Sequence, residues 1–110
     1  MRHSLRSSRD VIIRTPDLSQ AIHHYESIMG FAIFHHSANM VGFETGSFRL
    51  YIESGPAHPP VFDMLVDDVQ AAKAAMLAAG CELLEEDPQQ PRCYVRDRFG
   101  LTFNLGRTAS

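Results

Sequence analysis

The side chains in this chain that most readily bind metals or act as nucleophiles are six histidines and two cysteines. His23 and His24 are adjacent and lie on the polar face of a predicted helix, where solvated side chains are typical and no HExxH motif is present. His35 and His36 end a predicted strand. Their side chains should therefore point to opposite faces, so the pair cannot chelate one ion together.

The two cysteines, Cys81 and Cys93, offer neither a zinc spacing nor a disulfide framework. They fall on predicted strands that would be neighbours in one hairpin, and we expect small, buried or half-buried thiols. A nucleophilic cysteine would need an activating base nearby. The sequence places no such base beside either residue.

A third group of chemically capable residues alternates with apolar residues along the predicted strands. Successive side chains of a strand point to opposite faces, so alternate residues share a face. The apolar face, which includes Phe48, Leu50, Phe62 and Leu105, suits contact with helices. The opposite face carries the polar residues Arg14, Arg49, Tyr51, Glu53, Asp63, Thr102 and Asn104.

This polar set has two possible roles, because buried charge is costly unless it is paired or used. The residues could form a structural network, with one ion pair between Arg49 and Asp63 and another between Arg14 and Glu53. Alternatively, they could orient a small molecule, as a few convergent polar groups do in binding sites. In that case Glu53 or Asp63 would be the candidate general base, and the other residues would bind the ligand.

The elements that must position these residues form an internal repeat. Residues 10–15 and 61–66 are strand-like and are followed by Asp17 and Asp68, which suit helix N-caps. Amphipathic stretches at about 18–29 and 69–79 predict helices, and Gly30 and Gly80 suit the residue that ends each one. Three short strand-like runs follow each helix, and residues 55–60 form the predicted link. The sequence thus predicts an α+β fold of two tandem βαβββ repeats, at about 9–54 and 60–107, within a single domain.

Composition excludes several classes of protein. The chain has 110 residues, 45% of them hydrophobic and 21% charged, which is ordinary for one globular domain. A net charge of −3 without a basic run argues against a nucleic-acid partner. No apolar stretch approaches the ~20 residues of a membrane span, and no apolar core follows the basic N-terminus. We therefore expect no membrane partner and a cytoplasmic protein.

Five short motifs resemble those of the glyoxalase/bleomycin-resistance/dioxygenase (vicinal oxygen chelate) superfamily. Asp17-Leu-Ser-Gln-Ala21, followed by Tyr25 and Met29-Gly30-Phe31, resembles the D-L-x-x-A, F-Y and L-G-F elements of the first repeat. Val66-Asp-Asp-Val-Gln-Ala-Ala72 resembles the helix of the second repeat, and Asp97-Arg-Phe-Gly100 resembles the D-P-x-G turn. The resemblance covers about residues 9–107 and implies a curved sheet around a cleft, with helices outside and a metal inside.

The resemblance also implies four metal-ligand positions, which here hold Asp10, Tyr51, Val61 and Asn104. Valine cannot bind a metal, and tyrosine and asparagine are poor ligands for the divalent ions of the family. His58 lies three residues before Val61, and only a distorted loop would bring it to the ligand position. We therefore expect no cofactor, although a divalent metal held by ligands in another register stays an alternative.

The function implied by the resemblance has three variants. The first is a metal-independent protein that binds a small molecule, as in the bleomycin-resistance branch. The second is a metal-independent lyase or isomerase, and the third is a metal-dependent lyase, isomerase or dioxygenase. Two arginines on the polar face favour an acidic ligand over a cationic one. Chains of this size in the family usually pair, so we also expect a homodimer.

Overall fold

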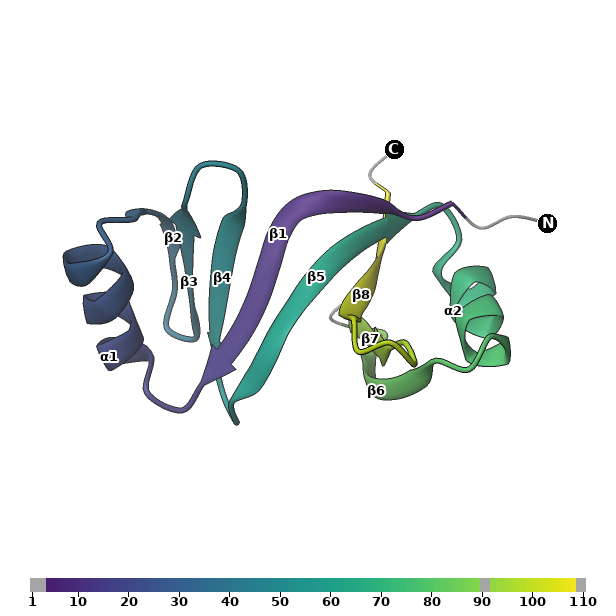
Figure 1. Ribbon diagram of the computed structural model, residues 1–110. Coiled ribbons are helices and arrows are strands. Elements are labelled where there is room, and N and C mark those ends of the chain that lie inside the picture. Colours follow the sequence, from purple (N-terminus) through teal and green to yellow (C-terminus); the bar gives the residue numbers. More distant parts are fainter. Residues whose placement is uncertain (1–3, 90–91, 109–110) are drawn as a thin grey trace. The chain divides into compact units, whose positions relative to one another are not determined.

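The computed structural model describes residues 4–89 and 92–108, and the chain divides into two compact units. The first unit is Arg9–Pro60. The second unit is Val61–Ser110 together with the N-terminal Met1–Ser8. The helices and strands follow one another in the order that the sequence predicts, and the predicted α+β fold of two βαβββ repeats is confirmed (Figure 1).

The first repeat consists of one strand, one helix and three further strands. Its elements are β1 (Arg6–Thr15), α1 (Leu18–Ile22), η1 (His23–Ile28), β2 (Ala32–His36), β3 (Met40–Glu44) and β4 (Arg49–Ser54). The strands are ordered β2-β3-β4-β1. β1 and β4 run parallel, whereas the other neighbours are antiparallel.

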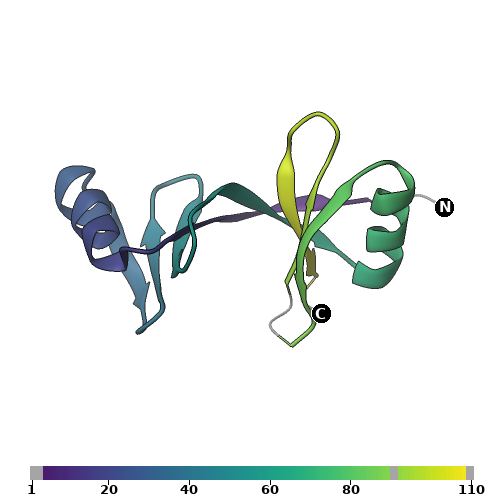
Figure 2. The same cartoon turned by 90° about the horizontal axis from the view of Figure 1, so that it is seen from below.

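The second repeat has the same succession of elements. They are β5 (His58–Val66), α2 (Val69–Ala78), β6 (Glu82–Asp87), β7 (Arg92–Arg96) and β8 (Thr102–Arg107). The strands are ordered β5-β8-β7-β6, with β5 and β8 parallel. Figure 2 shows α2 beside the strands of this repeat. None of the helices in the described part of the chain has the length and apolar character that crossing a membrane requires.

Each unit has its own hydrophobic core between its helix and one face of its strands. In the first unit, Val41, Phe43, Leu50 and Ile52 are buried beneath residues of α1 and η1. In the second unit, Val66, Val95, Phe103 and Leu105 are buried with Ala72 of α2. The apolar members of the alternating pattern therefore face the helices, and the polar members are left on the opposite face.

The helix boundaries follow the predicted local chemistry. The carboxylate of Asp17 accepts a hydrogen bond from the Gln20 backbone N–H at 3.0 Å, and Asp68 caps α2 through the Ala71 N–H at the same distance. Gly80 has φ +100°, a conformation that costs other residues energy. The first helix is less regular than predicted, because from His23 onward it is a π-helix, in which the Met29 N–H bonds to the His24 carbonyl.

Three predicted details differ from the structure. β1 begins at Arg6, before the predicted start of the repeat, and β5 begins at His58, so part of the predicted link is strand. Pro59 and Pro60 lie in that first part of β5, where a missing N–H is tolerated. Phe48 and Phe62 are 40% and 41% exposed rather than covered by helices. Phe62 lies two residues before Met64, where contact with the core around α2 begins.

Candidate functional site

The polar face of the first unit is organised around Arg49. β1 and β4 pair in a register that sets Asp10 opposite Arg49. Arg49 Nε donates a hydrogen bond of 2.7 Å to Asp10 Oδ1, and this bond raises the pKa of the guanidinium. The Arg49 side chain is 37% exposed. Among the described residues, its terminal nitrogens donate no hydrogen bond, so the end of the guanidinium is available to an external acceptor.

Two aromatic rings lie next to this guanidinium. The Arg49 guanidinium carbon lies 5.7 Å from the ring centroid of Phe34 and 6.0 Å from that of Tyr51. The two rings contact each other edge to face, with centroids 5.5 Å apart. Distances of this size are those of cation–π contacts. The face thus presents one positive group beside a pair of aromatic rings that contact each other.

Arg14 and Glu53 lie further along the same pair of strands. They are Cα partners in the register of β1 and β4, four residues beyond Asp10 and Arg49. The aliphatic stem of Arg14 occupies the space that a side chain at Gly55 would need, with its Cδ 2.6 Å from the position of an added Cβ. The structure therefore brings Arg14, Arg49, Tyr51 and Glu53 onto one face, as the alternation predicts.

A separate polar network lies in the second unit and is centred on Asp63. One carboxylate oxygen accepts a hydrogen bond from the Ser8 hydroxyl at 3.0 Å, and the other accepts from the Asn104 amide nitrogen at 2.9 Å. The Asn104 side-chain oxygen in turn accepts from the backbone N–H of Cys93 at 2.8 Å. Both oxygens of Asp63 are therefore held, and both ends of the Asn104 amide are used.

The backbone makes room for this network. Gly106 is buried, and a Cβ there would lie 2.9 Å from Asp63 Oδ1. Thr102, the remaining predicted ligand-binding residue, pairs with Arg96 in the register of β7 and β8 and is half-buried. Asn104 and Thr102 are two residues apart on β8 and share a face. Three of the seven predicted residues therefore belong to the second unit.

The proposed ion pair between Arg49 and Asp63 is replaced by other contacts. Arg49 pairs with Asp10, and Asp63 is bound by Ser8 and Asn104. The sequence did not identify Ser8 or Phe34 as members of a site. Ser8 lies before the predicted repeat, and Phe34 reads as one apolar residue of a strand. Both contacts join residues that are distant in the sequence, so the residue pattern does not show them.

The residues at the four implied metal-ligand positions do not fit a divalent cation. Val61 has no donor atom, and the side-chain oxygen of Asn104 already accepts from the Cys93 N–H. Asp10 holds Arg49 through one of its carboxylate oxygens. Within residues 4–89 and 92–108, no group of three or more His, Cys, Asp or Glu side chains could hold a metal ion. No step of chemistry is therefore assigned to a metal.

The two histidine pairs and both cysteines lie outside both polar groups. His23, His24, His35 and His36 are exposed. Cys81 and Cys93 belong to the core of the second unit, and burial raises the pKa of both thiols. A raised pKa lowers the thiolate fraction, which is the nucleophilic form. These cysteines are therefore packing residues in this structure.

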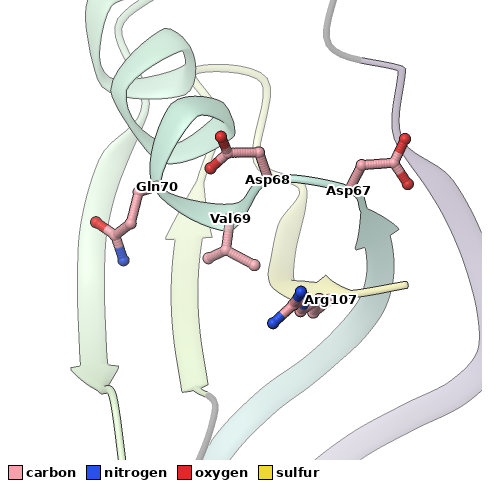
Figure 3. Close-up of a pocket in the computed structure, with 5 residues that line it drawn as sticks. All are labelled: Asp67, Asp68, Val69, Gln70 and Arg107. Carbon is pink, nitrogen blue, oxygen red and sulfur yellow. The ribbon is translucent and has the colours of Figure 1, made fainter. Parts of the chain in front are cut away.

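A hollow of about 390 Å³ lies where β8 ends and α2 begins. Asp67, Asp68, Val69, Gln70 and Arg107 line it. In Figure 3 the side chains of Asp67 and Gln70 point in opposite directions, and Asp68 is occupied as the N-cap of α2. Ligand sites have convergent polar groups, so the Arg49 face is the better candidate.

Comparison with known proteins identifies the fold. Neither a protein-family model nor a curated protein matches this sequence. Among solved structures, homoprotocatechuate 2,3-dioxygenase from Brevibacterium fuscum matches with a TM-score of 0.68 and 16% identity. A Mn(II)-bound glyoxalase from Novosphingobium aromaticivorans matches with a TM-score of 0.63 and 19% identity. A hypothetical protein from Bacillus halodurans C-125 matches with a TM-score of 0.69 and 9% identity.

The chain has the vicinal oxygen chelate fold, as its motifs predict. The matches cover 96–98% of this chain. The chain spans only 38% of the dioxygenase and 40% of the glyoxalase, but the match covers 96% of the hypothetical protein. At these identities the likeness establishes the fold, and function has to be argued from the site.

Proposed function

We propose that this protein binds an acidic small molecule on the polar face of its first unit, without the metal that is usual for the superfamily. The observation that carries the proposal is the state of Arg49. Asp10 accepts a hydrogen bond from Nε of the guanidinium, while the two terminal nitrogens donate no hydrogen bond to any described residue. A guanidinium presents such a pair of donors to a carboxylate or phosphate in a planar, bidentate arrangement.

The contact with Asp10 supports this role. A long arginine side chain loses much conformational freedom when it binds a ligand. Here the hydrogen bond to Asp10 and the contacts with Phe34 and Tyr51 already restrict that freedom. Preorganisation of this kind lowers the cost of binding. The carboxylate of Asp10 also offsets part of the positive charge, so we expect a monoanion to bind with modest affinity.

Metal independence is the second part of the proposal. It is supported by the side chains at the four implied ligand positions. They are a carboxylate bound to arginine, a phenol, a valine without a donor atom and an amide whose oxygen already accepts a backbone hydrogen bond. Elemental analysis of the purified protein tests it directly. We expect less than stoichiometric zinc, nickel, iron or manganese, and a near-equimolar content of any of them would overturn it.

A second candidate function is a metal-independent lyase or isomerase with Asp63 as general base. The observation in its favour is that Ser8 and Asn104 each hold one oxygen of this carboxylate, which fixes its orientation. A general base must also reach the proton that it removes. Turnover of small carbonyl compounds that is lost in Asp63→Asn would establish this function in place of simple binding. Glu53 is the alternative base, and Glu53→Gln is the matching variant.

The test of anion binding compares wild type with Arg49→Ala by calorimetry. The titrants are anionic metabolites and a cationic glycopeptide antibiotic of the bleomycin type, the alternative ligand that the superfamily suggests. Anion binding that is lost in Arg49→Ala supports the proposal. Tight binding of the cation that survives or improves in Arg49→Ala would refute it. Arg96→Ala is the matched control, because Arg96 is an exposed arginine of the second unit that pairs with Glu82.

We also propose a cytoplasmic location and a homodimer. Both cysteines are thiols rather than a disulfide, which agrees with a reducing compartment. Exposed apolar side chains such as Phe99, which is 82% exposed, and Ile28, which is 67% exposed, are available for contact with a second copy.

A further inference from the structure

Phe34 is a large apolar side chain that the first unit holds at its surface. Its ring is on the strand face opposite the core, and the residue is 44% exposed. The register of β2 against β3 shifts between Ile33 and His35, so Phe34 sits in a bulge. A bulge redirects a side chain and is often associated with a functional site.

Gly42 of β3 provides the space that Phe34 occupies. Gly42 is buried, and a Cβ built on it would lie only 2.8 Å from Phe34 Cζ. The ring therefore lies directly over the backbone of the neighbouring strand. Its position is defined by a missing side chain below it and by the edge of Tyr51 beside it.

The positions of Phe34 and Arg49 suggest how a ligand would bind. The guanidinium carbon of Arg49 is 5.7 Å from the Phe34 ring centroid, so a group bound at the end of this guanidinium lies close to the Phe34 ring. A carboxylate bound to the terminal nitrogens of Arg49 would have its substituent beside Phe34. An aromatic substituent gains more there than an aliphatic one, because offset and edge-to-face ring contacts add to the burial of area.

We infer that the ligand of this face is a planar aromatic anion, with Arg49 binding its acidic group and Phe34 contacting its ring. The inference rests on the proposed function, which assigns the anion to the same arginine. A cation is disfavoured by the charge of Arg49, and a neutral aromatic compound would offer the terminal nitrogens of Arg49 no charged acceptor, which makes the stronger hydrogen bonds. On this inference Arg49 selects the ligand for its negative charge, and Phe34 selects it for its planar ring.

The two selections can be separated with four small probes. We would titrate isotopically labelled protein with benzoate, cyclohexanecarboxylate, acetate and benzamide, and measure dissociation constants from backbone amide shifts. Benzoate has both the charge and the ring. Cyclohexanecarboxylate keeps the charge and the bulk without planarity, acetate keeps the charge alone, and benzamide keeps the ring and a neutral carbonyl acceptor without the charge. We expect benzoate to bind at least about twofold tighter than any other probe, which is the lower end of a ring–ring contribution.

Four variants assign the effect to residues. Phe34→Leu should weaken benzoate by about three- to tenfold and leave acetate unchanged, since only the ring contact is lost. Phe34→Tyr keeps a ring and should retain the preference for benzoate. This second variant tests the role of the ring even if Phe34→Leu does not fold. Phe48→Leu is the matched control, because Phe48 is a similarly exposed phenylalanine of the same unit. Arg49→Gln should abolish the binding of all three anions.

The outcomes distinguish this inference from the proposed function. If benzoate binds no tighter than cyclohexanecarboxylate, or if Phe34→Leu behaves like Phe48→Leu, the aromatic inference is overturned. The proposed function still stands in that case, provided that Arg49→Gln abolishes anion binding. If benzamide binds as tightly as benzoate and Arg49→Gln has no effect, the proposed function fails. If wild type binds none of the anions at millimolar concentration, both fail.

Discussion

Replacement of Asn104 by aspartate tests the network of the second unit. The Asn104 oxygen accepts from the Cys93 N–H, and its nitrogen donates to Asp63 at 2.9 Å. Asn104→Asp keeps the accepting oxygen but places a second carboxylate oxygen against Asp63. Since Asn104 is only 7% exposed, water can do little to separate the two charges. We expect a folded but destabilised protein.

The size of the effect follows from two contributions. Two unit charges about 4 Å apart repel by about 4 kcal/mol at an effective dielectric constant of about 20, an upper limit here because Asp63 is partly exposed. The hydrogen bond to the charged carboxylate, worth about 1.5–3 kcal/mol, is lost as well. The two contributions overlap, so we expect the free energy of unfolding to fall by about 2–4 kcal/mol. For a domain of this size, that lowers the melting temperature by roughly 10 °C or more.

Chemical denaturation followed by circular dichroism measures the change. Asn39→Asp is the control, because it adds the same charge at an exposed position. The double variant Asp63→Asn/Asn104→Asp exchanges the two groups and restores one donor and one charge. We expect it to recover most of the lost stability. The reasoning is refuted if Asn104→Asp is as stable as Asn39→Asp, or if the double variant is no more stable than Asn104→Asp.

Three further predictions concern other parts of the chain. Burial raises the pKa of the Cys81 and Cys93 thiols, so at pH 7 both should react with iodoacetamide more slowly than glutathione does. The buried Cys93 should react more slowly than Cys81. Equal rates for the two cysteines in the folded protein would contradict this. Gly80→Ala should cost about 1–2 kcal/mol in thermal unfolding because Gly80 has φ +100°, and Gly80→Asn should cost less; an unchanged melting temperature for Gly80→Ala would disprove it. Sedimentation at tens of micromolar should give a dimer, and a monomer would count against the proposed pairing.

The fold was predictable because local signals agree with one another. Asp17 and Asp68 cap helices, and Gly30 and Gly80 end them in the left-handed conformation. The Asp97–Gly100 turn also forms as its motif suggests, with the Asp97 carboxylate accepting from the Phe99 and Leu101 backbone N–H groups. Each of these contacts spans four residues or fewer, so a short stretch of sequence contains both partners.

The site was less predictable because its contacts join distant residues. Asp10 and Arg49 are 39 residues apart, and Ser8 and Asp63 are 55 apart. Alternation placed Arg49 on the correct face, but only the register of β1 against β4 shows that Asp10 is its partner. The sequence before Asp10, Arg6-Ser-Ser-Arg9, has no apolar alternation, so neither the early start of β1 nor the role of Ser8 could be inferred.

The bulge at Phe34 has a counterpart in the other unit. The register of β6 against β7 shifts between Leu83 and Glu85, and β2 and β6 are the outermost strands of their repeats. An uninterrupted outer strand exposes a row of N–H and C=O groups that invites another chain to add to it, and bulges interrupt that row. Both edge strands, β2 and β6, are therefore protected against aggregation by strand addition. Any pairing of two copies is expected to use side-chain surfaces instead of a continuous ladder across β2 or β6.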